Sequence, residues 1–312
     1  MSSTVGRIGI VGSGSVGTYY GARMVGAGAE VRFLMRSDLE TVRRRGSLRI
    51  HDAAGMTEVA PVAVFGSPAE IGPVDLVVLT VKTTSSAAVR ELVSPLLGAK
   101  TAIFTLQNGL GVDEYLAGLF GAERIMGALV FMAITRIAPG EVRCFHPGMV
   151  SVGEFRGPAV ERTRALVDLL AASGMKAFAV DNLLEARWRK LVWNIPFNGL
   201  SIAEGGVTTD RICSEPRLAA EARALMVEVQ SAAGALGFAI PDAFLDKQFE
   251  VTPPMGPYRP SSLVDFMAGR DVEVEPIWGE PLRRAGAAGV AMPHLERLYG
   301  RLRALCPGSP AP

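Results

Sequence analysis

Three polar residues recur every four positions within one strongly apolar segment. Lys190, Asn194 and Asn198 stand at positions i, i+4 and i+8, so a helix places them on one face. The residues around them are large and apolar: Trp188, Leu191, Trp193, Ile195 and Phe197. Burying a lysine and two amides in such a helix costs free energy unless these groups have partners. The spacing therefore predicts a functional site.

A lysine and two amides on one face suit the reduction of a carbonyl group. A hydride that reaches a carbonyl carbon leaves an alkoxide, which needs a proton donor within hydrogen-bond reach. Lys190, partly removed from water, can supply that proton, while Asn194 and Asn198 orient substrate oxygens. Pro196 interrupts the same helix, and such a local conflict is typical of functional segments. The alternative is a lysine that reaches water from the end of a buried helix.

A glycine motif near the N-terminus predicts a dinucleotide site. Residues 12–17 follow an apolar strand and open a helix, which is the context that a GxGxxG motif needs. The first glycine permits a tight turn, the second lets a pyrophosphate approach the backbone, and the third lets helix and strand pack closely. We expect the cofactor to bind at Gly12, Ser13, Gly14, Ser15, Val16 and Gly17. The alternative is a glycine-rich turn without a ligand.

The end of the second strand bears on which dinucleotide is bound. Proteins that bind NAD usually place Asp or Glu there, about 20 residues after the motif, to hold the ribose 2′-hydroxyl. Here that strand ends at 34–37, and Glu30 lies at its start. Arg36 is placed to receive a 2′-phosphate, which suits the fork of donors on a guanidinium. We therefore expect NADP, against the alternative that Arg36 is a solvated loop residue.

Two further strand ends carry polar residues at the carboxyl edge, where open parallel sheets bind ligands. Lys82 follows an apolar run that ends at Val81, and Asn108 follows one that ends at Leu106. We expect Lys82 to bind the cofactor or the substrate carboxylate, and Asn108 to contact both cofactor and substrate. The alternatives are a surface lysine and a turn residue, since Asn-Gly is common in turns.

These residues depend on elements that the apolar pattern predicts. Strand-like runs, which alternate with helical stretches, lie at 30–35, 75–81, 101–106 and 124–133. The alternation predicts a parallel sheet with crossover helices, and 141–153 suggests a hairpin at the sheet edge. Longer helical stretches follow at 182–198, 215–236, 241–249, 275–288 and 293–305. We expect a cofactor-binding domain over 1–180 and a helical substrate and dimerisation domain over 181–312.

Composition and charge argue against several other classes of protein. The chain of 312 residues has a formal net charge of +1 with scattered Lys and Arg, whereas nucleic-acid binding needs a basic stripe. No apolar run approaches the roughly 18 residues of a membrane span. The three cysteines and three histidines are dispersed, so we expect no metal site. Free thiols in a chain of this size fit the reducing cytoplasm.

Taken together, these motifs resemble the ketopantoate reductases (2-dehydropantoate 2-reductases), a branch of the 6-phosphogluconate-dehydrogenase-like superfamily. The resemblance spans nearly the whole chain, from the glycine motif through Lys82, Asn108 and Lys190 to the segment 261–279. It implies an α/β fold with a Rossmann-like parallel-sheet domain, followed by an all-helical C-terminal domain.

The resemblance also assigns roles to individual residues. It implies that Lys190 is the general acid and that Asn194 and Asn198 bind substrate beside it. It further implies substrate contacts from Ser262 and Glu273, which on sequence alone look like a helix cap and a solvated charge. Glu275 stands where the family often has aspartate, and this departure bears on the substrate.

The leading interpretation is NADPH-dependent reduction of 2-dehydropantoate to (R)-pantoate, a step of pantothenate biosynthesis. A close alternative is the same reaction on another small 2-oxo acid. A third reading is a non-catalytic NADP-binding redox sensor, which would have no need of an amine such as that of Lys190. The long helices are compatible with a homodimer through the helical domain.

Overall fold

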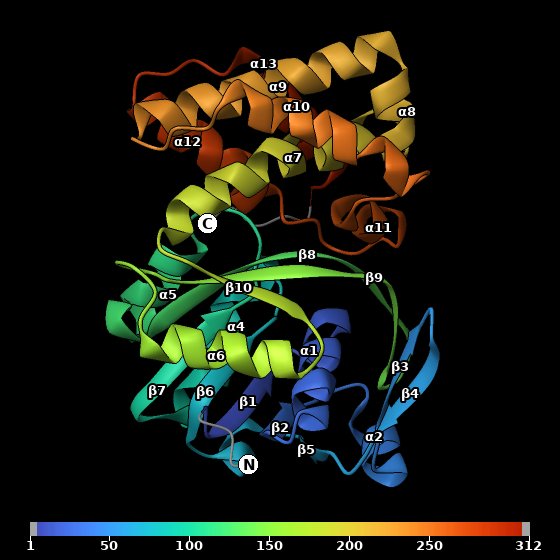
Figure 1. The fold of residues 1–312 in the computed structure, drawn as a ribbon, viewed down its shortest axis with the longest axis vertical. Coiled ribbons are helices and arrows are strands. Elements are labelled where there is room, and N and C mark those ends of the chain that lie inside the picture. The colour runs from blue at the N-terminus through green and yellow to red at the C-terminus, as the bar shows by residue number, and fades with distance from the viewer. Residues whose placement is uncertain (1–4, 308–312) are drawn as a thin grey trace. The chain divides into compact units, whose positions relative to one another are not determined.

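The computed structural model describes residues 5–307, except for the side chains of residues 86 and 87. Backbone contacts separate the chain into two compact units, residues 1–107 with 113–183 and residues 108–112 with 184–312. The first unit is an α/β sheet domain and the second is helical, so the predicted fold class is confirmed (Figure 1). The segment 108–112 follows a sheet strand yet belongs to the helical unit.

Six strands of the first unit form a parallel sheet. They are β1 (Arg7–Val11), β2 (Glu30–Leu34), β5 (Ala63–Phe65), β6 (Val74–Leu79), β7 (Leu97–Thr105) and β8 (Ile125–Ala138). Their order is β5-β2-β1-β6-β7-β8, so the chain crosses from one side of β1 to the other between β5 and β6. Ligands of such sheets bind at the carboxyl ends of the strands at this switch point.

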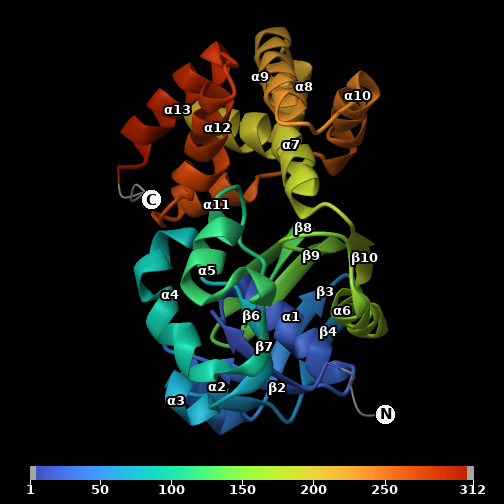
Figure 2. The same cartoon turned by 90° about the vertical axis from the view of Figure 1, so that its left-hand side faces the viewer.

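Helices cover both faces of this sheet. Leu76 and Val78 of β6 pack on the side of α1 (Ser15–Gly26) and α6 (Glu161–Ala172). Val77 and Leu79 are buried on the other face, where Figure 2 shows α4 (Ser86–Val93) and α5 (Val112–Phe120). Because both faces are buried, the central strands read as nearly continuous apolar runs.

An extension with antiparallel pairs continues the sheet beyond β8. β9 (Glu141–Glu154) pairs antiparallel with β8 and parallel with β3 (Leu48–Asp52) and β10 (Lys176–Val180). β3 pairs in turn with β4 (Gly55–Val59). The predicted hairpin over 141–153 is wrong, because these residues form the single strand β9.

The glycine at 148 explains the error. It has a φ of +56°, and a Cβ at this position would lie 1.4 Å from the carbonyl oxygen of Phe131. The register between β8 and β9 shifts between Phe131 and Ala133, close to this contact. The sequence His146-Pro147-Gly148 therefore marks an irregularity within a strand pair rather than a turn.

All regular secondary structure between residues 184 and 307 of the second unit is helical. Its helices are α7 (Leu183–Ala203), α8 (Thr209–Ser214), α9 (Pro216–Ala235), α10 (Asp242–Val251), α11 (Ser261–Met267), α12 (Glu280–Ala287) and α13 (Pro293–Leu305). The predicted helix over 275–288 begins as a π-helical turn, Glu275–Gly279, and continues as α12. Pro281 has no N–H to donate to the carbonyl of Ile277, so one α-helical hydrogen bond is missing where the π-helical turn passes into α12.

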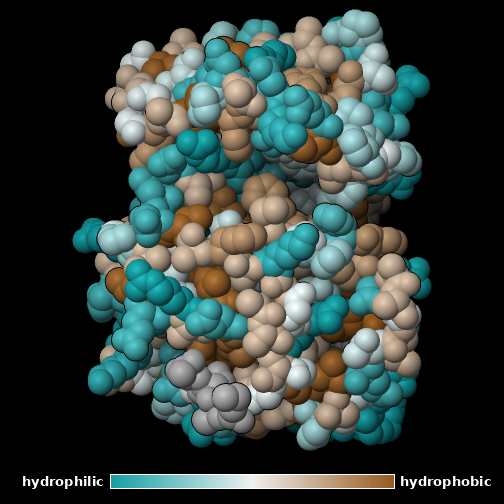
Figure 3. Space-filling model, in the orientation of Figure 1, coloured by the Kyte–Doolittle hydropathy of each residue, from teal (hydrophilic) through white to brown (hydrophobic). Residues whose placement is uncertain are grey.

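The surface mixes hydrophilic and hydrophobic residues over both units on the face drawn in Figure 3. Exposed aromatic and methionine side chains of the sheet extension include the cross-strand pair Phe131 and Met149, together with Phe178 of β10. Among the described residues, no helix has the length and apolar character needed to cross a membrane. The same residues contain no group of three or more His, Cys, Asp or Glu that could hold a metal ion.

A buried glutamate joins two helices of the second unit. Glu228 of α9 is 8% exposed, and its carboxylate accepts the backbone N–H groups of His294 at 2.7 Å and Leu295 at 2.8 Å. These N–H groups belong to the first turn of α13 and have no acceptor within that helix. A negative charge there also interacts favourably with the helix dipole.

Replacing this carboxylate should destabilise the helical unit. We expect Glu228→Ala to lower the free energy of unfolding by about 1–3 kcal/mol, because two buried N–H groups lose their acceptor. Glu221→Gln is the control, since the ion pair of Glu221 with His294 is partly exposed and contributes at most about 1 kcal/mol. Urea unfolding followed by circular dichroism measures both, and equal midpoints for the two variants would contradict the prediction.

Candidate functional site

The glycine motif forms the turn between β1 and α1. Gly12 has a φ of +104°, and a Cβ there would lie 2.5 Å from the backbone nitrogen of Val81. A Cβ on Gly17 would lie 2.2 Å from the carbonyl oxygen of Gly12. Gly14 is exposed, and no heavy atom of the described chain lies within 4 Å of the Cβ position it leaves open. The turn is thus tight at Gly12 and Gly17 and open at Gly14, which is the arrangement that a pyrophosphate requires.

The other residues of the motif complete this cradle. Ser13 donates its hydroxyl to the carbonyl oxygen of Leu34 at 2.7 Å, which ties the turn to the end of β2. The hydroxyl of Thr80 donates to the carbonyl oxygen of Gly12 from the end of β6. Ser15 and Val16 open α1, where the first N–H groups lack helical acceptors and can face an anion.

Arg36 follows β2 and is exposed to solvent. Two residues later, Asp38 is only 4% exposed and faces a different partner, the β8–β9 hairpin. Its carboxylate accepts hydrogen bonds from the Arg136 guanidinium and from the backbone of Gly140 at 2.8 Å. Burial alone would raise the pKa of Asp38, but these donors outweigh it and hold the pKa below its usual range. Asp38, the acidic residue nearest the end of β2, is therefore already bound by Arg136 and Gly140 of the same unit.

Lys82 and Gln107 lie at the ends of neighbouring strands. Lys82 follows β6 and is half-buried. Gln107 follows β7 and donates its amide to the carbonyl oxygen of Val81 at 2.8 Å, which joins the two strand ends. The glycine turn, Arg36 and Lys82 therefore follow three neighbouring parallel strands, β1, β2 and β6, at the carboxyl edge of the sheet.

The lysine site lies within the helical unit. Lys190 of α7 is half-buried, and its Nζ donates a hydrogen bond to Oδ1 of Asn108 at 2.5 Å. Burial is the main cause that lowers the pKa of Lys190, to about 7, and the nearby Arg187 charge adds to it. The carboxylate of Glu273 acts in the opposite direction. An amine with this pKa can both hold and release a proton near neutral pH.

Asn108 reaches Lys190 because residues 108–112 pack into the helical unit. Leu110 belongs to the hydrophobic core of that unit, and its N–H donates to the carbonyl oxygen of Pro276 at 2.8 Å. Gly109 has a φ of +84°, and a Cβ there would lie 2.2 Å from the same carbonyl oxygen. Glycine is required at this position both by its backbone conformation and by the close approach.

The two asparagines of α7 have different surroundings. Asn194 is 7% exposed and lines a small cavity with Gly109, Arg187, Lys190 and Leu191. Asn198 is also buried, and its Oδ1 accepts the backbone N–H of Ser262 at 3.0 Å. This bond fixes the start of α11 on α7, so the structure brings Ser262 beside Asn198.

Sequence reasoning missed three residues that shape these sites. Thr80 and Gln107 support the glycine turn and the strand ends, and both follow apolar runs as Lys82 and Asn108 do. Arg187 is the third, a buried arginine that donates to the carbonyl oxygen of Gly109 at 3.2 Å. Its position three residues before Lys190 puts it on the same side of the helix, and that spacing could have revealed it.

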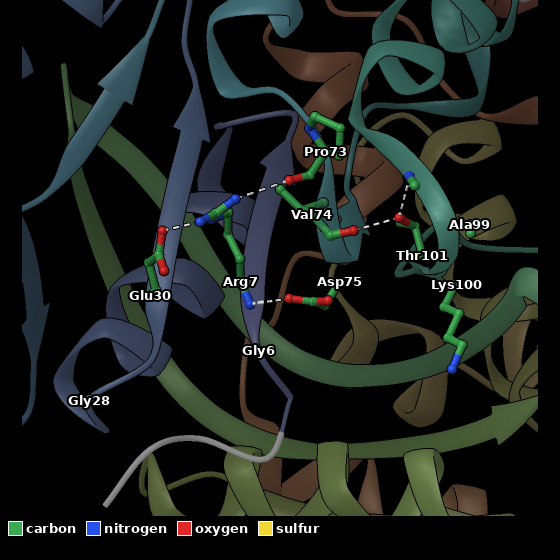
Figure 4. Close-up of a pocket in the computed structure, with 11 residues that line it drawn as sticks. Gly6, Arg7, Gly28, Glu30, Pro73, Val74, Asp75, Ala99, Lys100 and Thr101 are labelled. Carbon is green, nitrogen blue, oxygen red and sulfur yellow. Dashed lines mark hydrogen bonds and ion pairs between the residues drawn. The ribbon is translucent and has the colours of Figure 1, made fainter.

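A larger cavity lies in the sheet unit. It has a volume of about 490 Å³ and opens at the amino ends of β1, β2 and β6 (Figure 4). Arg7 pairs with Glu30 at 2.8 Å, and Asp75 accepts the N–H of Arg7 at 2.7 Å. Arg7, Glu30 and Asp75 thus bind one another. The cavity lies at the edge of the sheet opposite the glycine turn. Size alone does not identify the functional site here.

Models of known families match both units. The model described as "Ketopantoate reductase PanE/ApbA" matches residues 8–157, and the model of its C-terminal domain matches residues 182–305. A 2-dehydropantoate 2-reductase of Nostoc sp. is 33% identical over 301 residues, which cover 95% of this chain and 94% of that protein. The chain belongs to the ketopantoate reductase family. It is accordingly an oxidoreductase, and the resemblance inferred from its motifs is confirmed.

Solved structures share the fold of this ketopantoate reductase family member. A 2-dehydropantoate 2-reductase of Geobacter metallireducens is 39% identical with a TM-score of 0.92, covering 96% of this chain and 99% of that one. A D-mandelate dehydrogenase, solved with NADH and anilino(oxo)acetate, is 21% identical with a TM-score of 0.85. It covers 96% of this chain and 97% of that one, and at this identity it shows the fold alone.

The glycine motif gives a test of the cofactor site in this family member. We expect Gly14→Ala to fold normally but to weaken dinucleotide binding about tenfold or more, because the methyl group enters the open space beside the turn. Gly26→Ala is the matched control, since it also has open space but lies at the far end of α1. Fluorescence titration with NADPH and NADH measures the affinity, and unchanged binding by Gly14→Ala would place the dinucleotide elsewhere.

Proposed function

We propose that this enzyme reduces 2-dehydropantoate to (R)-pantoate with NADPH, and that Lys190 donates the proton. The observation that carries the proposal is the hydrogen bond of 2.5 Å between the Lys190 amine and Asn108, together with a pKa of about 7 for that amine. The names of the Nostoc and Geobacter relatives support the substrate, since both align over nearly the full chain.

The chemistry follows from the groups around Lys190. The glycine turn and Arg36 would hold NADPH, which when bound would supply a hydride for the C2 carbonyl carbon of the substrate. The protonated Lys190 amine hydrogen bonds the C2 oxygen and gives it a proton as negative charge develops there. Asn194, Asn198, Ser262 and Glu273 provide amide, hydroxyl and carboxylate groups for the oxygens and hydroxyl group of the substrate. The lowered pKa of Lys190 makes proton transfer easier than from an ordinary lysine.

Two residues at the end of β2 support NADP over NAD. Arg36 is exposed with its guanidinium available at the place where a 2′-phosphate is expected. Asp38, the acid that could otherwise bind the 2′-hydroxyl of NAD, is buried against Arg136 and Gly140. Arg36 can therefore contact the cofactor, whereas the buried carboxylate of Asp38 cannot.

Substitution of Arg36 tests this preference. We expect Arg36→Ala to raise the KM for NADPH about 10- to 100-fold, since a charge-assisted pair with phosphate is lost, and to leave the KM for NADH nearly unchanged. Arg43→Ala is a control, because Arg43 is exposed on α2 (Leu39–Arg45) and pairs with Glu40. Equal effects of Arg36→Ala on both cofactors would contradict the assignment.

The substrate is tested by following NADPH oxidation at about 340 nm with a panel of 2-oxo acids. Turnover that is fastest with 2-dehydropantoate supports the proposal. Preference for a bulkier 2-oxo acid would favour the second candidate, a reductase of another acid. That candidate draws on the aromatic cluster of Trp193, Phe197 and Tyr258 next to the asparagine face. NADPH binding without turnover of any acid would instead favour a redox sensor.

The role of Lys190 predicts a specific pH dependence. We expect Lys190→Ala to lower kcat for reduction by roughly 10²–10⁴-fold while the dissociation constant for NADPH changes little. In the wild type, kcat/KM should fall as the pH rises above about 7, because the amine loses the proton that it must donate. Lys100→Ala, a lysine at the opposite edge of the sheet, is the control. A variant at 190 that kept both rate and pH profile would exclude Lys190 as the acid.

The homodimer through the helical domain and the cytoplasmic location stay predictions. The division of labour between a cofactor domain over 1–180 and a substrate domain over 181–312 is likewise part of the proposal. It places the glycine turn in the first domain and Lys190, Asn194, Ser262 and Glu273 in the second.

A further inference from the structure

Arg187 is a cation buried within the lysine site. Its side chain is 3% exposed, and it precedes Lys190 by one helical turn on α7. Burying a guanidinium is costly unless it is hydrogen bonded, and an arginine cannot escape this cost by losing its proton. A second positive charge next to an amine adds to that cost. The contacts of this guanidinium must therefore offset the cost of its burial.

The contacts of Arg187 and Lys190 fall on adjacent residues of one segment. Arg187 donates to the carbonyl oxygen of Gly109 at 3.2 Å, and Lys190 donates to the side chain of Asn108 at 2.5 Å. On its other side, Gly109 lies against the carbonyl oxygen of Pro276. Gly109 is therefore held between α7 and the π-helical turn, and the direction of the Asn108 side chain follows from that anchor.

Exposure separates Arg187 from its neighbour Lys190. Both line a small cavity with Gly109, Leu191 and Asn194. Lys190 is half-buried, so a substrate can reach its amine, whereas only 3% of Arg187 is exposed and its guanidinium donates to the backbone of Gly109. Arg187 is thus placed to act through its neighbours and not on the substrate directly.

We propose that Arg187 is a positioning residue, which anchors the Gly109 carbonyl so that Asn108 holds the amine of Lys190 in place for proton transfer. The inference rests on the proposed role of Lys190 as proton donor. The fixed positive charge of Arg187 has a second effect, because it disfavours the protonated form of the Lys190 amine. The charged groups that act on this amine are Arg187 from α7 and Glu273 from the segment before the π-helical turn, with opposite signs.

Two substitutions separate the charge from the anchor. Arg187→Met removes both, and we expect the pH at which kcat/KM falls to rise by about one unit or more, since a repelling charge is gone. Arg187→Lys keeps a cation but loses the guanidinium geometry, so we expect a lower kcat with a much smaller shift of the pH profile. A role limited to stability would lower the melting temperature without moving the profile. That outcome would overturn the charge effect.

A double-mutant cycle tests the anchor. If Arg187 acts through Asn108, the variant with Arg187→Met and Asn108→Ala together should have a kcat no lower than the worse single variant. Independent, multiplicative losses in kcat would overturn the positioning role. Should Arg187→Met fail to fold, Arg187→Lys serves in the same cycle.

A direct titration keeps this test independent of the substrate. The chain has five lysines, so reductive methylation with ¹³C-formaldehyde gives few NMR signals, and Lys190→Ala assigns the one of interest. We expect the titration midpoint of Lys190 to be higher in Arg187→Met than in the wild type. This shift would appear even if no 2-oxo acid is turned over, whereas an unchanged midpoint with normal turnover would reject the inference and leave the proposed function intact.

Discussion

The hydrogen bond between the Lys190 amine and Asn108 is the interaction on which the rest of the site depends. For the proposed proton transfer, an ammonium group of ordinary pKa in water is a poor donor at neutral pH, because it holds its proton too strongly. Partial burial on α7 and the charge of Arg187 bring the pKa to about 7, and Glu273 stops it from falling further. The amide of Asn108 accepts a bond from the amine without adding a charge that would reverse this balance. A carboxylate at position 108 would raise the pKa of Lys190 and so counteract the effect of burial.

This interaction requires a sheet loop to pack among helices. Asn108 follows β7, yet residues 108–112 group with the helical unit and contribute Leu110 to its core. Gly109 allows the close approach to Pro276, and the π-helical turn at 275–279 presents the carbonyl that receives Leu110. Pro276 and Pro281 lie in and directly after this turn. Because Pro281 has no N–H, the carbonyl oxygen of Pro276 stays available to the N–H of Leu110. The same loop ties the chemistry of Lys190 to a residue whose position is set by the end of a strand.

Sequence reasoning was most successful where the determining signal is local. The glycine turn is encoded in six consecutive residues, and the polar face of α7 in a four-residue repeat, so both could be read from spacing. The bond from Lys190 to Asn108 joins residues 82 positions apart, and the pairing of Asp38 with Arg136 spans 98. No periodicity reports such contacts, because they depend on how the chain is folded. The hairpin over 141–153 failed for a related reason, since His146-Pro147-Gly148 reads as a turn until the contact with Phe131 shows a strand irregularity.

The environment of Asp38 shows how a distant strand pair can change the charge present at the end of β2. An aspartate two residues after Arg36 would, if exposed, repel a 2′-phosphate and offer an acceptor to the 2′-hydroxyl of NAD. The tip of the β8–β9 hairpin prevents this by supplying Arg136 and the Gly140 N–H to that carboxylate. Burial in a pair also removes the charge of Asp38 from the field that the cofactor would meet. The β8–β9 hairpin thus buries the negative charge of Asp38, and the positive charge of Arg36 stays exposed at the end of β2.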